Sequence, residues 1–329
     1  MKLTVSPSPH VHHPDTVTGI MLDVIIALVP ALAASVFVFG FRSLLITAVC
    51  VASCVLFEFI SRKIMKRDTT IGDLSAVVTG MLLAFNCPVT IPLWMCVVGS
   101  AAAIILAKQL FGGIGQNFVN PAIAGRIVML VSFSSAMTNW TAPYDWAAKT
   151  DAVTAASPLS YLKNYDGALS AELPTLRQMF LGLRPGCIGE VCIAALLIGG
   201  IYLCIRKVIK PVVPLCFIGT VAVVMLIAGK GDLEFVAYEL LSGGLFLGAI
   251  FMATDYSTTP VTTWGKVIFA VGCGLITSLI RLFGNLPEGV SYSILIMNIL
   301  VPHIETLTTP KPFGTVKEDK HSGKEAKTA

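Results

Sequence analysis

The sequence predicts an all-α polytopic membrane protein with ten transmembrane helices, arranged as two inverted five-helix repeats that contain broken helices. Three observations lead to this fold class. Of the 329 residues, 55% are hydrophobic and only 13% are charged, a balance that would leave a water-soluble surface largely apolar. The apolar residues occur in long runs, and short motifs recur about 172 residues apart in the two halves of the chain.

Ten apolar segments are candidates for membrane spans, which need roughly 20 residues of helix. They cover residues 20–40, 43–60, 73–86, 92–108, 121–138, 187–206, 211–229, 235–253, 266–283 and 289–304. The third segment is short and stops at Asn86-Cys87-Pro88, which predicts a half-helix whose freed carbonyl groups are satisfied inside the protein. The nine cysteines show no CxxC spacing, so we interpret them as apolar helix residues rather than metal ligands.

Lysine and arginine residues predict the orientation, because short cytoplasmic loops carry an excess of them. The basic clusters at 62–67 and 206–210, Lys266 and the tail at 311–327 are therefore assigned to the cytoplasm. Both termini are then cytoplasmic, at the inner (plasma) membrane of a bacterial cell, and the long loop at 139–186 lies outside.

This orientation divides the chain into four parts. They are an N-terminal five-helix repeat (1–138), an extracytoplasmic loop (139–186), which carries the candidate flavinylation motif considered below, a C-terminal five-helix repeat (187–305) and a disordered cytoplasmic tail (306–329). The repeat is indicated by Leu-Phe-Gly motifs that follow the fourth and the ninth apolar segments. Because each unit has five spans, an odd number, the second is inverted relative to the first. Chance similarity between two apolar sequences is the alternative.

The loop contains the segment 151–159, DAVTAASPL, which by itself is typical of a solvated turn. It also resembles the flavinylation site D-x-x-[ST]-G-A-[TS], in which the last hydroxyl forms a phosphoester with flavin mononucleotide (FMN). Ser157 is then the covalent FMN acceptor, Thr154 the alternative acceptor, and Asp151 the carboxylate of the transferase motif. Ser157 replaces the usual threonine, and Ala155 replaces the usual glycine.

A second motif, GGIGQNFVNPA at 112–122, follows the fourth segment. Asn117 and Asn120 are three residues apart, so on one helical turn their amides face the same side and suit the polar edge of a flavin ring. A glycine-rich turn followed by an Asn120 cap and Pro121 at the first position of a helix explains the same residues without a ligand.

These motifs together resemble the NqrB/RnfD family of membrane subunits. The resemblance rests on SPSPH at 6–10, the asparagine motif, the flavinylation loop, MATD at 252–255 and PVT at 260–262. NqrB members carry a longer N-terminal extension, so the RnfD branch is the closer match.

Family membership implies one covalent FMN on the outer side and a riboflavin near the cytoplasmic side, where Asn117 and Asn120 match flavin-contacting asparagines. It implies a complex that passes electrons from ferredoxin to NAD⁺ and moves Na⁺ or H⁺ outward. The implied partners are the other Rnf subunits, membrane and soluble, and a flavin transferase. Membrane lipid surrounds the spans, and no nucleic-acid partner or metal site is predicted.

Ionisable residues within apolar segments are further candidates, because a charge in a membrane is costly unless it is paired or hydrated. Asp23, Arg126 and Asp255 are candidates for an ion path. A structural ion pair of Asp23 with Arg126 explains the first two equally well. Glu58 and Arg281 lie near predicted span ends, and we expect their charges to reach the membrane surface.

Three functions fit the sequence to different degrees. An electron-carrying subunit of an ion-pumping oxidoreductase explains the flavinylation loop, its outer placement and the asparagine pair. A solute or ion channel explains the inverted repeats with breaks, since such repeats also build transporters. A purely structural anchor for soluble partners explains the spans alone.

Overall fold

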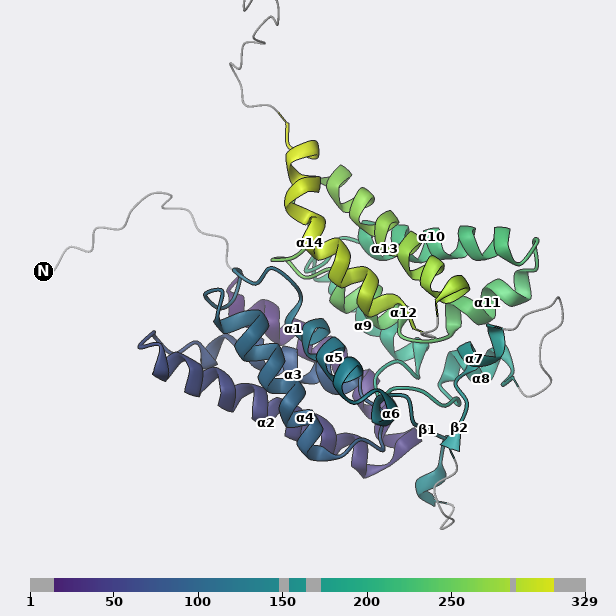
Figure 1. The fold of residues 1–329 in the computed structure, drawn as a ribbon, viewed down its shortest axis with the longest axis horizontal. Helices are drawn as coiled ribbons and strands as arrows, with labels where there is room; N and C mark the ends of the chain where they lie inside the picture. The colour runs from purple at the N-terminus through teal and green to yellow at the C-terminus, as the bar shows by residue number, and fades with distance from the viewer. Residues whose placement is uncertain (1–14, 148–153, 164–172, 285–287, 311–329) are drawn as a thin grey trace, which may run out of the picture.

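The computed structural model describes residues 15–147, 154–163, 173–284 and 288–310, and the described part is almost entirely helical (Figure 1). The first half comprises α1 (Val17–Phe39), α2 (Phe41–Ile64), the short 3₁₀ helix η1 (Ile71–Asp73), α3 (Ser75–Phe85), α4 (Leu93–Ala101), its π-helical continuation η2 (Ala102–Gln109), α5 (Pro121–Ser132) and α6 (Ser134–Met137). Every apolar segment predicted in this half contains a helix.

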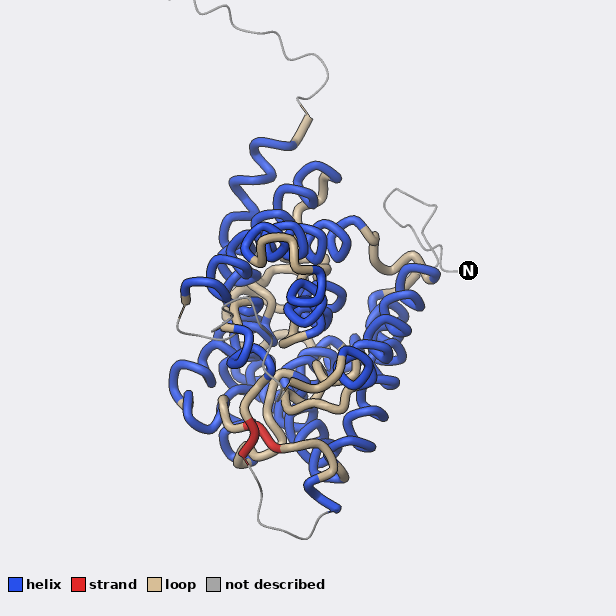
Figure 2. Tube along the Cα trace, turned by 90° about the vertical axis from the view of Figure 1, so that its right-hand side faces the viewer, coloured by secondary structure: helices blue, strands red, loops and turns tan. Residues whose placement is uncertain are grey.

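The connecting loop is folded in the residues that are described. Its elements are β1 (Trp140–Thr141), the 3₁₀ helix η3 (Asp145–Ala147), β2 (Thr154–Ala155), α7 (Pro158–Leu162) and α8 (Leu176–Leu181). The two strands pair antiparallel, with Trp140 opposite Ala155. This hairpin lies at the end of the molecule away from the C-terminal end of the last helix (Figure 2).

The second half is helical again. It comprises α9 (Ile193–Ile205), α10 (Val212–Ala228), α11 (Leu233–Leu241), α12 (Leu245–Leu247), its π-helical continuation η4 (Gly248–Met252), α13 (Thr263–Phe283) and α14 (Val290–Thr308). The helices of the two halves gather on opposite sides of the molecule, and α1 packs against α9 where the halves meet (Figure 1).

Among the residues that the structure describes, four helices are long and apolar enough to cross a membrane, namely α1, α2, α13 and α14. A fifth candidate is α11 together with α12 and η4, which are bent by 65° at their break. The remaining apolar helices are shorter. The chain is therefore a multi-pass membrane protein in which several apolar helices are shorter than these candidate spans.

The break after α3 is satisfied by a distant segment, as the sequence predicted for a half-helix. The Phe85 carbonyl accepts a hydrogen bond from the Gly189 amide at 2.9 Å, and the Cys87 carbonyl accepts one from Ile188 at 3.0 Å. Backbone groups buried in a membrane need such partners because lipid offers none. The start of the second half thus completes a helix end of the first half.

Glycine permits close packing of α3 against α2 in the first half. A Cβ atom added at Gly80 in α3 would lie only 2.6 Å from the Cα atom of Val51 in α2. Small residues allow two backbones to approach in this way, which is a common means of helix association in membranes. The position of α3, and of the polar residues at its two ends, depends on this contact.

Candidate functional site

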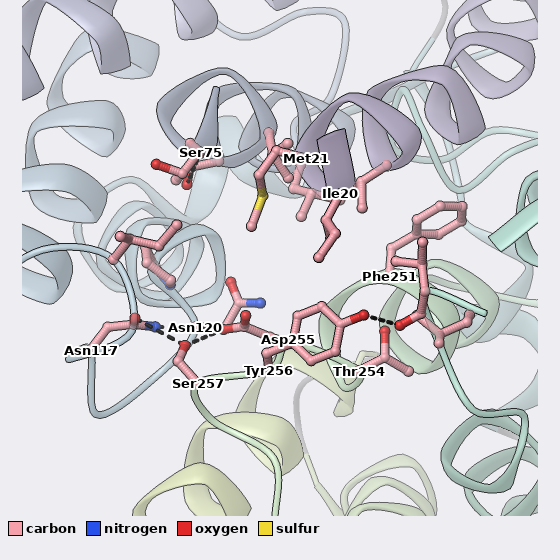
Figure 3. Close-up of a pocket in the computed structure, with 18 of the residues that line it drawn as sticks. Ile20, Met21, Ser75, Asn117, Asn120, Phe251, Thr254, Asp255, Tyr256 and Ser257 are labelled. Atoms are coloured by element: carbon pink, nitrogen blue, oxygen red, sulfur yellow. Dashed lines mark hydrogen bonds between the residues drawn. The ribbon is translucent and has the colours of Figure 1, made fainter. Parts of the chain in front are cut away.

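The main cavity lies between the two halves and contains about 780 Å³ of space, part of it open to solvent. Its apolar wall comes from α1, α3 and η4, including Ile20, Met21 and Phe251 (Figure 3). Its polar side comes from the loop before α5 and the loop after η4. Small-molecule sites commonly combine an apolar wall with a few convergent polar groups.

Asn117 and Asn120 both line this cavity, although they do not share a helical turn. Asn117 lies in the loop before α5, so the prediction of a common helical turn is wrong. Asn120 caps α5: its side-chain oxygen accepts from the Ala122 amide at 3.0 Å, and Pro121 occupies the first turn. The capping interpretation of Asn120 is confirmed, and the residue faces the cavity as well.

Asp255 joins the asparagines from the other half of the chain. Its Oδ2 atom accepts hydrogen bonds from Ser257 at 3.0 Å and Thr258 at 3.2 Å, and from Asn117 at 3.5 Å. The Ser257 hydroxyl also donates to Asn117 Oδ1 at 3.0 Å (Figure 3). Burial raises the pKa of Asp255, and these hydrogen bonds oppose the rise. Two loops that are far apart in sequence are thereby fixed to each other.

Lys108 also lines the cavity, although its place in the sequence did not single it out. It lies at the end of an apolar segment, where a lysine commonly reaches for the membrane surface. In the structure its ammonium group instead points inward, donating to Ser75 Oγ at 2.6 Å and Glu58 Oε2 at 2.8 Å. Glu58 is therefore buried and paired, which contradicts its expected place at the membrane surface.

The remaining ion-path candidates lie apart from the cavity and from each other. Asp23 pairs at 3.1 Å with Arg206, which directly follows α9, and accepts from Tyr202 at 2.8 Å. Arg126 pairs with Glu288 instead, so the predicted pair of Asp23 with Arg126 is wrong. Arg281 is also buried, in a 3.0 Å pair with Glu239, rather than placed at the membrane surface.

The residues of the flavinylation motif are described in part. Ser157 is partly exposed between β2 and α7, in an extended conformation directly before Pro158. Thr154 belongs to β2, where it is paired with Thr141. Asp151 lies outside the described residues, as does the tail from 311 onward. Ser157 lines a separate small cavity together with Glu190 and Glu288, with about 290 Å³ of space, part of it open to solvent.

The main cavity has the properties that a flat aromatic cofactor with polar edges requires. Asn117 and Asn120 keep hydrogen-bonding capacity beyond their protein contacts, because an amide has two donor protons and two acceptor lone pairs. Met21 and Phe251 provide apolar surface for a ring. The residues present therefore fit a bound flavin such as riboflavin.

Comparisons with known proteins agree over almost the whole chain. A model of the NQR2, RnfD, RnfE family matches residues 4–314. The chain is 46% identical, over 98% of both sequences, to the D subunit of the Na(+)-translocating ferredoxin:NAD(+) oxidoreductase complex of Acetobacterium woodii. It is 42% identical to the proton-translocating counterpart of Clostridium ljungdahlii, over 95% of this chain and 96% of the relative.

A more distant relative is the D subunit of the ion-translocating oxidoreductase complex of Escherichia coli, which is 34% identical over 95% of this chain and 99% of its own length. Identity at this level over nearly complete chains shows common descent and a common fold. The chain therefore belongs to the NQR2, RnfD, RnfE family of membrane proteins.

Proposed function

We propose that the chain is the D subunit of an Rnf-type ferredoxin:NAD⁺ oxidoreductase that moves Na⁺ or H⁺ across the bacterial inner membrane. The observation that carries this proposal is the match to subunits of that name over at least 95% of the chain. The other Rnf subunits then provide the ferredoxin and NAD sites, and a flavin transferase matures this one.

The proposed architecture is ten spans in two inverted repeats, with both termini in the cytoplasm. The helix positions support it: shifted by about 172 residues, α1, α2 and α3 fall on α9, α10 and η4, and α4 with η2 and α5 fall on α13 and α14. The hairpin that precedes Ser157 lies away from the end of α14, which suits a loop outside and a tail inside (Figure 2).

Two flavins are proposed, a covalent FMN on Ser157 and a riboflavin in the main cavity. Bound flavins supply one-electron transfer, and the chain's own residues hold them in place. The partly exposed, extended position of Ser157 suits a hydroxyl that a transferase must reach. Asn117 and Asn120 would hydrogen-bond to the edge of the riboflavin ring, while Met21 and Phe251 would cover its faces.

Coexpression with a flavin transferase tests the covalent site. The denatured protein should give a fluorescent band under ultraviolet light, and mass spectrometry should find one FMN on the peptide that contains Ser157. Ser157→Ala should remove both signals. Ser160→Ala, which deletes an exposed hydroxyl three residues away, is the matched control and should keep them.

The outcomes separate the alternatives. An FMN adduct on Thr154 in the Ser157→Ala protein would assign the attachment site to Thr154 instead of Ser157. The positive control is a known transferase substrate that becomes labelled in the same cells. If the wild-type band is not fluorescent there, the result favours a channel or transporter without a redox role. The helix break between α11 and α12 is the feature that such a channel would share.

A further inference from the structure

A network of buried charges lies where the two helix breaks meet. Arg126 of α5 donates to Asn86, at the end of α3, and to Glu288, which precedes α14. The backbone amide of Gly244, at the start of α12, donates to Glu288 Oε1 at 3.0 Å. The arginine and the glutamate therefore join both breaks and both halves of the chain.

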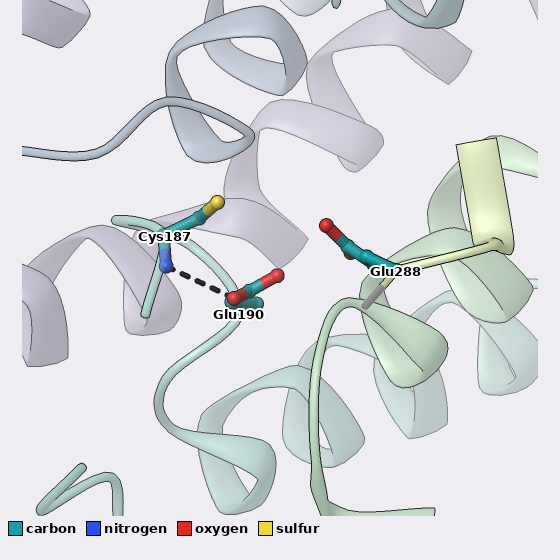
Figure 4. Close-up of side chains that lie close together, drawn as sticks. All are labelled: Cys187, Glu190 and Glu288. Atoms are coloured by element: carbon teal, nitrogen blue, oxygen red, sulfur yellow. Dashed lines mark hydrogen bonds between the residues drawn. The ribbon is translucent and has the colours of Figure 1, made fainter. Parts of the chain in front are cut away.

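Glu190 enters this network from the segment before α9 (Figure 4). Its Oε1 atom accepts a hydrogen bond from the Cys187 amide at 3.0 Å. Its Oε2 atom is buried and has no hydrogen-bond partner among the residues that the structure describes. The residue as a whole is only 5% exposed. A buried carboxylate oxygen without a partner is costly, so this atom points to something that it binds.

The free oxygen of Glu190 faces the carboxylate of Glu288. Ligand atoms of Cys187, Glu190 and Glu288 lie within 4.8 Å of one another. A Cβ atom added at Gly244 would lie 3.0 Å from Glu190 Oε2 and 2.5 Å from Glu288 Oε1, so both oxygens converge on this glycine. Two carboxylates this close in a buried site make the binding of a proton by one of them more favourable, because their charges repel each other.

Arg126 argues against a metal ion at this place. Its guanidinium contacts Glu288, and one of its nitrogens lies 4.0 Å from the Cys187 sulfur. A metal ion between these groups would meet a fixed positive charge, and the hard cations Na⁺ and Mg²⁺ prefer oxygen ligands to a thiol. A proton needs only one free oxygen, which Glu190 supplies.

The surrounding charges are balanced. Arg184 donates to the Glu190 backbone carbonyl at 2.7 Å and to the Gly243 carbonyl at 3.4 Å. Arg281 of α13 donates to the Ser242 carbonyl at 3.1 Å and pairs with Glu239. In the described part of the chain the network thus contains three arginines and three glutamates, and an added negative charge nearby would disturb this balance.

We propose that Glu190, paired with Glu288, is a proton-binding site that takes up one proton when the flavin on Ser157 is reduced. The proposal rests on the proposed covalent flavin, and Ser157 lines the same cavity as both glutamates. A flavin bound there would accept one electron from the preceding carrier of the complex, and Glu190 Oε2 would bind one proton from the solvent. The net charge around the cavity would then stay the same, and reoxidation of the flavin would release the proton.

Infrared difference spectroscopy tests the site without any flavin. In the Ser157→Ala protein, lowering the pH should produce the carbonyl stretch of a protonated buried carboxyl group. This band should be absent from Ser157→Ala/Glu190→Gln and should return, shifted, in Ser157→Ala/Glu190→Asp. Glu234→Gln in the same background, which changes an exposed glutamate of α11, is the control and should keep the band.

A second measurement tests the coupling in flavin-loaded protein. The midpoint potential of the covalent flavin should fall as the pH rises through the range in which the band titrates, and Glu190→Gln should flatten this dependence. An unchanged dependence in that variant would overturn the coupling. If Glu190→Gln does not accumulate as folded protein, Glu190→Asp should shift the titration range.

The outcomes are distinguishable. A band that persists in the Glu190→Gln background overturns the site itself. If NaCl removes the band at constant pH and choline chloride does not, the site binds a metal ion rather than a proton, and the proposal is overturned. Failure of the wild-type chain to acquire FMN overturns the coupling and the proposed function, while the flavin-free spectra still decide whether Glu190 binds a proton.

Discussion

Lys108 and Glu58 form an ion pair inside the first half of the chain, with 2.8 Å between Nζ and Oε2 and exposed side-chain fractions of 3% and 0%. The pair connects η2 to α2, and hydrogen bonds extend it to Ser75 and to Thr70. Because Lys108 also lines the main cavity, the pair positions a positive charge beside the proposed riboflavin site.

Glu58→Gln should strongly destabilise the protein, because it leaves the Lys108 charge buried without its partner. Breaking a buried pair in this way costs about 3–5 kcal/mol, and the thermal unfolding midpoint in detergent measures it. Asp23→Asn is the matched control, since Arg206 in that pair has a side chain that is 55% exposed and remains hydrated. Equal shifts in the two variants would contradict the difference in burial.

Gly80→Ala should separate α3 from α2. The added methyl group would meet the backbone of Val51, which has no room to move aside, and overpacking of this kind costs about 1–3 kcal/mol. Thermal unfolding is again the measurement. Gly219→Ala in α10 is the control, because no atom lies within 4 Å of the added Cβ, and it should leave the midpoint almost unchanged.

The proposed orientation predicts which single cysteines react from outside the cell. Lys163→Cys, on the exposed end of α7, should be labelled in intact spheroplasts by a maleimide that does not cross the membrane. Arg67→Cys, in the exposed loop after α2, should be labelled only after the membrane is opened. The reverse pattern would invert the topology. Labelling of the wild-type chain measures the background from its nine native cysteines, and this background is subtracted.

Asn117→Ala should reduce the flavin that is released from the protein by acid denaturation, because it removes an amide from the main cavity and loosens Asp255 and Ser257. The covalent flavin should stay with the precipitated chain, so chromatography of the supernatant measures the cavity alone. Asn139→Ala, an exposed asparagine elsewhere, should release the wild-type amount. Unchanged release from Asn117→Ala would remove Asn117 from the site.

The helix positions could be predicted because hydropathy is a local property of the sequence. The ion-pair partners of the buried charges could not be predicted, because each acidic residue could pair with any of several arginines. Asp23 selects Arg206 rather than Arg126 because α1 packs on α9. That choice depends on helix packing, which the sequence of either helix alone does not contain.

Glu190 could have been predicted from its place in the sequence. It lies inside the apolar segment predicted at 187–206, so it is a candidate on the same physical grounds as Asp23. Its partner Glu288 lies just before the last apolar segment, 289–304, and carries no such signal. The asparagines of the main cavity could be predicted from their motif, but their contact with Asp255 depends on the fold.

The hydrogen bonds from Ile188 and Gly189 to the end of α3 have a consequence for biosynthesis. The ribosome completes Phe85 about 100 residues before Gly189, and until then the carbonyls of Phe85 and Cys87 have no donor from this segment. Exposed to lipid, such groups cost several kcal/mol each. The end of α3 therefore cannot reach its final arrangement until the segment at 188–189 has been synthesised and has packed against it.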